Sequence, residues 1–111
     1  MLLGYIGSED MQEIQDKIRL FCEKYNLENN IDIRMLDIIS EVGELSKEVI
    51  KGSNYGKKEF SKTENTDMEF GDVLFSLTVL ANKLDVNLGK SLDMALEKYK
   101  KRLKKGKMGS E

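Results

Sequence analysis

The hydrophobic and polar positions of this chain repeat with the period of an α-helix over four separate segments. The clearest segment covers residues 31–51, where an apolar side chain recurs every three or four positions. The repeating residues are Met35, Ile38, Val42, Leu45 and Val49. The same period predicts further helices over about 9–26, 66–84 and 88–104. The pattern therefore predicts an all-α fold.

Polar and glycine-bearing stretches separate the predicted helices. The stretches "NLENN" and "DVNLG" are short connections, whereas "GSNYGKKEFSKTEN" is long enough to form a mobile loop over a site. Ser8, Thr66 and Asn87 are residue types that cap helix N-termini, and each stands where a helix is predicted to begin. Four helices joined in this way predict a four-helix bundle-like subunit.

The helix predicted over 66–84 is apolar on two sides. One face collects seven residues: Phe70, Val73, Leu74, Leu77, Leu80, Ala81 and Leu84. A second stripe lies nearly opposite and consists of Met68, Phe75 and Val79. A helix that is apolar on two sides requires cover on both. We therefore expect a homo-oligomer, either a homodimer or a homotetramer, whose interface uses the second stripe.

The length of 111 residues fits one domain over residues 1–111, with an N-terminal arm over 1–8 and a frayed tail over 105–111. No apolar run approaches the roughly 18 residues needed to cross a membrane. Cys22 is the single cysteine, which excludes an intramolecular disulfide and fits a reducing cytosol. Its place on the apolar face of the first helix predicts a buried thiol. We expect a cytoplasmic protein.

The composition also limits the chemistry. The chain contains no histidine, so catalytic triads that depend on imidazole are excluded, and carboxylates, lysine, arginine or a metal must do any chemistry. The net charge is −2, and the basic residues concentrate locally near the C-terminus. This balance makes nucleic acid an unlikely partner.

Carboxylates follow the edge of the apolar stripe on the second predicted helix. They form one line at i, i+4, i+7 and i+11, which consists of Asp37, Glu41, Glu44 and Glu48. On the third predicted helix, Glu69 and Asp72 are three residues apart, and with Ser76 and Lys83 they form a polar strip between the two apolar faces. If the two helices pack antiparallel, both acid pairs can converge.

Convergence of these acids would be costly without a cation. Carboxylates about 4 Å apart repel by roughly 4 kcal/mol per pair at an effective dielectric near 20. Oxygen ligands select hard ions, so we expect Mg²⁺, with Mn²⁺ or Ca²⁺ as the alternatives. Structural explanations stay open at this point. Thr66 and Glu69 have the spacing of a capping box, and Glu44 could pair with Lys47 or Lys51 on a solvated face.

With both acid pairs in view, the chain resembles the MazG-type nucleotide pyrophosphohydrolases of the all-α NTP pyrophosphatase superfamily. The resemblance runs from about Leu36 to Arg102 and rests on "SEVGELSKEV", the glycine-bearing loop, "EFGDVLFSLTVLANKL" and "SLDMALEKYKKR". It implies that magnesium is held by Glu41, Glu44, Glu69 and Asp72. The leading glutamate of the family's tandem pair is Ser40 here. Ser40 projects away from the acidic line, so the change need not remove a metal ligand but bears on any role in positioning or activating water.

The resemblance implies a Mg²⁺-dependent hydrolase that cleaves a (d)NTP between the α and β phosphates into a (d)NMP and pyrophosphate, with house-cleaning as one form of this activity. Four carboxylates and a triphosphate carry more charge than one ion neutralises, so two or more ions are expected. Glu41 or Glu44 would orient or deprotonate the attacking water.

Basic residues are the candidates for substrate contacts. The last predicted helix resembles the family's basic segment, which makes Lys98 and Arg102 candidates for phosphate binding. Lys83 on the acidic strip and Lys57 in the loop could also touch phosphate. For Lys98 and Arg102 the alternative is that they only complement the dipole of a helix end in solvent.

Two other functions stay open. The first is a phosphoribosyl-ATP pyrophosphatase or another specialised nucleotide hydrolase of the same fold, which substrate profiling would separate. The second is a non-catalytic, metal-binding helical interaction module that kept the fold and lost turnover together with the leading glutamate. Stabilisation by Mg²⁺ without turnover of any nucleotide would favour the second.

Overall fold

A computed structural model describes residues 8–27 and 29–106 of the chain. It contains four helices and, within these residues, no strand. The helices are α1 (Ser8–Lys24), α2 (Ile31–Lys51), α3 (Thr66–Lys83) and α4 (Leu88–Lys104). The all-α class is confirmed, and each helix boundary lies within two residues of the predicted one. The predicted arm and tail fall almost entirely outside the described residues.

Asparagine side chains cap the N-termini of two of the helices. Asn30 Oδ1 accepts a hydrogen bond from the backbone N–H of Ile33, and Asn87 Oδ1 accepts one from Lys90, as was predicted for Asn87. The prediction for Thr66 is wrong. Asn65 precedes α3 without a side-chain cap, and Thr66 is the first residue of the helix. The capping box therefore does not explain Glu69.

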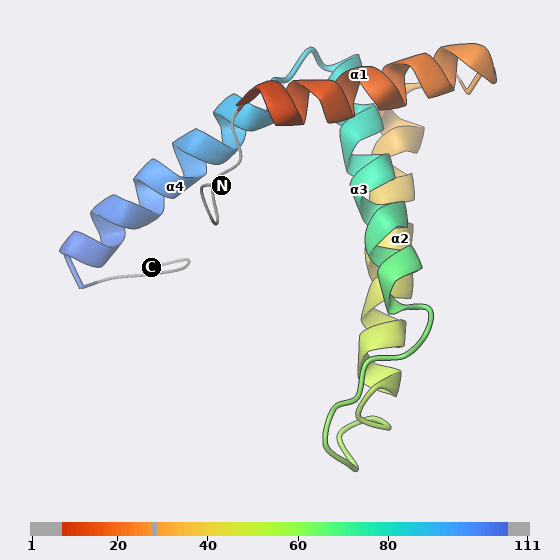
Figure 1. Ribbon diagram of the computed structural model, residues 1–111, viewed down its shortest axis with the longest axis vertical. Coiled ribbons are helices and arrows are strands. Elements are labelled where there is room, and N and C mark those ends of the chain that lie inside the picture. The colour runs from red at the N-terminus through yellow and green to blue at the C-terminus, as the bar shows by residue number, and fades with distance from the viewer. Residues whose placement is uncertain (1–7, 28, 107–111) are drawn as a thin grey trace.

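The four helices form an open arrangement. Helices α2 and α3 run antiparallel along their whole length, α1 lies across one end of this pair, and α4 extends from α1 away from it (Figure 1). Among the described residues, α4 makes its extensive contacts with α1 alone. The chain by itself therefore does not close all four helices around one core.

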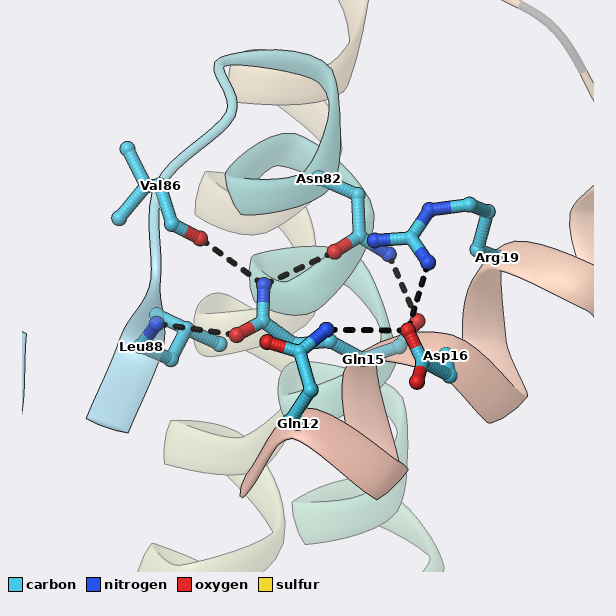
Figure 2. Close-up of polar contacts among 7 residues, drawn as sticks. All are labelled: Gln12, Gln15, Asp16, Arg19, Asn82, Val86 and Leu88. Atoms are coloured by element: carbon cyan, nitrogen blue, oxygen red, sulfur yellow. Dashed lines mark hydrogen bonds and ion pairs between the residues drawn. The ribbon is translucent and has the colours of Figure 1, made fainter. Parts of the chain in front are cut away.

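A buried glutamine holds the corner between α3 and α4. Gln15 of α1 is 3% exposed, and its Nε2 donates to Asn82 Oδ1 and to the Val86 carbonyl, both at 2.9 Å. Its Oε1 accepts from the Leu88 N–H at 3.0 Å, and Asn82 Nδ2 donates back to the Gln15 carbonyl (Figure 2). These bonds join α1, the end of α3 and the start of α4. They determine the direction in which α4 leaves the α2–α3 pair.

The core is small and lies where α1 crosses α3. Among the described residues its buried apolar side chains are Cys22, Val79 and Ala81, so the predicted burial of the Cys22 thiol is confirmed. The residue beside them, Thr78, is completely buried and donates its hydroxyl to the Leu74 carbonyl at 2.7 Å. No helix in the described part of the chain is long and apolar enough to cross a membrane.

The structure covers part of the second stripe of α3, which is predicted to lie at an interface, although Met68 at the start of this stripe is exposed. Val79 of the second stripe is buried within the chain, and Phe75 packs edge-on against Phe21 of α1 at 5.9 Å between ring centroids. Most of the first face is exposed instead, namely Phe70, Leu74, Leu77 and Leu84. Helix α2 packs on the side of α3 that carries Glu69 and Asp72, so these four apolar residues stay exposed among the described residues.

Candidate functional site

Five carboxylates gather where the middle of α2 faces the first turns of α3. The pKa of Glu69 is raised, first by loss of hydration and then by the negative charges of Asp72, Glu44, Glu41 and Glu48. The antiparallel packing of the two helices therefore brings together the four carboxylates that the sequence assigns to a metal. We call these five residues the acidic cluster.

The acidic cluster is open to solvent on one side. Glu41, Glu69 and Asp72 are half-buried, whereas Glu44 is exposed. In the described residues no three carboxylates lie close enough together to hold an ion. The donor set nevertheless fits a hard divalent cation, because every donor is a carboxylate oxygen and the crowding of negative charge is what such an ion relieves. Carboxylates that lie near one another without a cation repel.

Glu48 is the member of the cluster that the sequence did not assign to the site. Its Oε2 accepts a short hydrogen bond from Thr63 Oγ1, which is 2.9 Å from Thr66 Oγ1, and its Oε1 lies 3.7 Å from Lys51 Nζ. Its side chain is mostly buried, so these contacts hold the carboxylate in place. The i, i+7 spacing of Glu48 from Glu41 indicates that both lie on one side of α2. Spacing alone could not predict the hydrogen bond from Thr63 in the loop.

The loop between α2 and α3 folds back onto the end of α2. The Ser61 N–H donates to the Gly52 carbonyl at 2.8 Å, and Gly52 is buried under Phe60. A Cβ at Gly52 would stand 2.4 Å from the Phe60 ring, so only glycine allows this approach. The loop thus lies at the Glu48 end of the acidic cluster. It carries Lys57, whose side chain is exposed.

Three of the predicted substrate contacts lie away from the acidic cluster. Lys83 is eleven residues beyond Asp72 on the same helix, which is about 16 Å. It lines a hollow of about 160 Å³ between α1 and α3 instead. Lys98 and Arg102 lie on α4 beside Tyr99, with Lys98 Nζ 4.7 Å from the ring centroid. Because α4 leaves the α2–α3 pair, the chain does not bring these two residues to the cluster by itself.

Ser40 is exposed on α2, as its place outside the acidic line predicts. Its neighbour Glu41 points toward α3 and contributes to the charge around Glu69. The departure from the family motif therefore leaves the acidic cluster intact.

The model of the MazG nucleotide pyrophosphohydrolase domain matches residues 30–106, which include the acidic cluster, the loop and α4. The chain belongs to the MazG nucleotide pyrophosphohydrolase domain family. A protein of Bacillus subtilis strain 168, YpjD, is 40% identical over an alignment of 101 residues, and the match covers 87% of this chain and 89% of YpjD.

Two crystal structures have the same fold as this chain. The structure of YpjD from Bacillus subtilis superposes with a TM-score of 0.68 and 30% identity, and covers 80% of this chain and 93% of YpjD. A MazG protein conserved in Bacillus, a nucleotide pyrophosphohydrolase, superposes with a TM-score of 0.69 over 88% of this chain and 93% of its own. Its identity of 22% supports the fold alone. The chain is thus an all-α member of a family of pyrophosphohydrolases.

Proposed function

We propose that this protein is a Mg²⁺-dependent nucleotide pyrophosphohydrolase that converts a (d)NTP into a (d)NMP and pyrophosphate. The observation that supports it best is the gathering of Glu41, Glu44 and Asp72 around Glu69, with a raised pKa of Glu69. A structural role alone gives no reason to concentrate this much negative charge between two packed helices. Membership of the pyrophosphohydrolase family supplies the type of bond that is cleaved.

Glu41, Glu44, Glu69 and Asp72 would hold the magnesium. The chemistry that magnesium supplies when bound is neutralisation of phosphate charge and activation of a water nucleophile. Two or more ions fit the charge of the cluster together with a triphosphate better than one does.

The carboxylates divide into two groups by their surroundings. Glu48 is held by Thr63 and Lys51, so it can orient a neighbouring group without moving. Glu44 has no such hydrogen bond among those seen in the described residues and is exposed. We assign proton acceptance from water to Glu41 or Glu44, because a base must be able to reach the water and then release the proton to solvent.

The loop is the part of this chain best placed to meet the substrate beside the acidic cluster. Its attachment to Gly52 and Glu48 holds its base next to the carboxylates, and Lys57 is exposed at its tip region. A lysine there would pair with phosphate oxygens that the carboxylates repel. Lys57 is therefore our candidate within the chain for a phosphate contact.

The metal site is tested by stability, which does not require a known substrate. Mg²⁺ at ten times its Kd stabilises the folded state by about 1.4 kcal/mol, and the melting temperature of the wild type should rise accordingly. Glu69→Gln should lose most of this rise. Glu97→Gln, which removes an exposed carboxylate on α4, is the matched control and should keep it. An equal rise in both variants would remove Glu69 from the metal site.

A further inference from the structure

The end of the α2–α3 pair that lies next to the loop contains little apolar core. Within the described residues α2 has no buried residue, and the buried residues of α3 are Thr66 and a group that begins at Ser76. Helix α1 crosses the opposite end of the pair, so it does not cover the loop end (Figure 1). Hydrophobic burial therefore contributes less to holding α2 and α3 together at the loop end than it does where α1 crosses α3.

Three polar side chains join α2, the loop and α3 at this end. Thr63 Oγ1 of the loop donates to Glu48 Oε2 of α2, and it lies 2.9 Å from Thr66 Oγ1 of α3. The Thr66 N–H also donates to the Thr63 carbonyl at 3.3 Å, so the two threonines share a turn at the start of α3. Thr66 is 5% exposed, which shields this contact from water. We call Glu48, Thr63 and Thr66 the Thr–Glu chain.

The chemistry of the three groups fixes the direction of the hydrogen bonds in the Thr–Glu chain. An ionised carboxylate only accepts, so Thr63 donates its single hydroxyl proton to Glu48. The Thr66 hydroxyl is then the donor to Thr63 Oγ1. Hydrogen bonds that end on a charged acceptor are stronger than those between neutral groups, and successive bonds in one direction strengthen each other. The chain therefore draws the start of α3 toward the carboxylate on α2.

Glu48 differs from the four carboxylates that we assign to magnesium. Its Oε2 accepts from Thr63, its Oε1 lies 3.7 Å from Lys51 Nζ, and its side chain is 12% exposed. Glu44, one turn earlier on α2, is exposed. Both oxygens of Glu48 are thus paired with groups outside the acidic cluster. This pairing suits a carboxylate that holds the surrounding structure in place better than one that binds the ion directly.

The Thr–Glu chain lies one helical turn from the magnesium ligands. Glu69 follows Thr66 by three residues on α3, and Glu44 precedes Glu48 by four residues on α2. Because the two helices run antiparallel, one turn away from the chain leads to Glu44 on one helix and to Glu69 on the other (Figure 1). The negative charges of Glu44 and Glu48 both act on Glu69. Their repulsion pushes the helices apart, and the chain opposes that separation.

We propose that Thr63 and Thr66 are positioning residues that hold Glu69 opposite Glu44 for magnesium, and that Thr63 also fixes the base of the loop that carries Lys57. The part of this inference that concerns magnesium rests on the proposed function, whereas the attachment of the loop does not. Loss of an outer hydrogen-bond partner lowers the metal affinity of a site by about 10- to 100-fold. Loss of the Thr63 hydroxyl breaks both hydrogen bonds of the chain, whereas loss of the Thr66 hydroxyl leaves the bond to the carboxylate.

Calorimetric titration with Mg²⁺ tests the positioning role without requiring a substrate or turnover. Thr63→Val keeps the shape of threonine and should raise the Kd for Mg²⁺ by about 10-fold, the lower end of the range, because the chain acts through the spacing of the helices. Thr66→Val should raise it less, and Thr63→Ser, which keeps the hydroxyl, should restore the wild-type Kd.

Thr78→Val is the matched control for this titration. It removes another buried threonine hydroxyl of α3, which donates to the Leu74 carbonyl at 2.7 Å away from the acidic cluster. This variant should be less stable but should bind Mg²⁺ as the wild type does. A wild-type Kd in Thr63→Val, or an equal rise in Thr63→Ser and Thr63→Val, would overturn the positioning role. A wild type that takes up no Mg²⁺ would overturn the metal site and the positioning role with it.

Limited digestion with trypsin tests the attachment of the loop in metal-free protein. Trypsin cleaves after lysine, and the loop carries the exposed Lys57 and Lys58. Cleavage after these residues should become severalfold faster in Thr63→Val, because the loop opens more often, and should keep the wild-type rate in Thr63→Ser. Cleavage after Lys101 on α4 is the internal control and should not change. Equal cleavage of the loop in Thr63→Val and the wild type would show that Thr63 does not hold the loop. Because this digestion needs no metal, a failed attachment and a failed metal site give different results.

Discussion

Replacing Gln15 with leucine should strongly destabilise the fold without touching the acidic cluster. The Gln15 amide makes three hydrogen bonds of 2.9, 2.9 and 3.0 Å, to Asn82, Val86 and Leu88. Leucine has nearly the same volume but leaves all three partners unsatisfied in a region that is 3% exposed at Gln15. A buried polar group that loses its partner costs about 1–3 kcal/mol. Because water can reach part of this corner, we expect a total loss of about 2–4 kcal/mol.

Urea unfolding followed by circular dichroism measures this loss at one fixed protein concentration. The melting temperature should fall by about 8–32 °C, at roughly 4–8 °C for each kcal/mol. Gln12→Leu is the matched control, since Gln12 makes one exposed hydrogen bond to Asp16 and should lose only a few tenths of a kcal/mol. If Gln15→Leu were as stable as Gln12→Leu, the glutamine would not hold the α3–α4 corner and our account of the open fold would be wrong.

Three further outcomes follow from the site. In metal-free protein the raised pKa of Glu69 means that the folded state keeps a proton which the unfolded state has already lost, so the free energy of unfolding should fall as the pH rises from about 4.3. This fall should be shallower in Glu69→Gln. If the melting temperatures of the wild type and the variant changed equally between pH 4 and 7, the reasoning would be contradicted. Gly52→Ala should lower the free energy of unfolding by about 1–3 kcal/mol, because the added Cβ pushes Phe60 off the end of α2. Gly43→Ala is the control, since a Cβ there meets nothing, and equal melting temperatures of the two variants would argue against the close approach of Phe60 to Gly52. Lys57→Ala should raise KM about 5- to 20-fold with little change in kcat, while Lys104→Ala should not; a loss in kcat alone would assign Lys57 to the transition state instead.

The helices were predictable because the hydrophobic period of each segment depends only on local sequence. The same holds for the convergence of the acidic pairs, which needed only their spacing and an antiparallel hairpin. The cap at Asn87 could be read from its residue type, whereas Thr66 and Asn65 are neighbours of similar capping propensity, and the wrong one was chosen.

The features that sequence reasoning missed depend on how the helices are arranged in space. Periodicity predicts that α3 is apolar on two sides, but it does not show which side α1 and α2 cover. The prediction places Phe75 and Val79 on the uncovered side, whereas Phe70 and Leu77 are exposed in the structure. Membership of one polar strip likewise says nothing about distance along the helix, and Lys83 lies about three turns beyond the acidic cluster. The corner at Gln15 joins residues more than 65 positions apart, which no local pattern reveals.

The most direct test of the proposed function is release of pyrophosphate from a panel of canonical and modified NTPs and dNTPs, with and without Mg²⁺. We predict that the wild type releases pyrophosphate and the matching monophosphate from at least one nucleotide, only when Mg²⁺ is present, and that Glu41→Gln and Asp72→Gln lower this rate by at least 100-fold. Unchanged Mg²⁺-dependent release in these variants would contradict the assignment of the acidic cluster. No release from any nucleotide, in protein that Mg²⁺ stabilises, would show that the cluster binds metal without hydrolysing nucleotides.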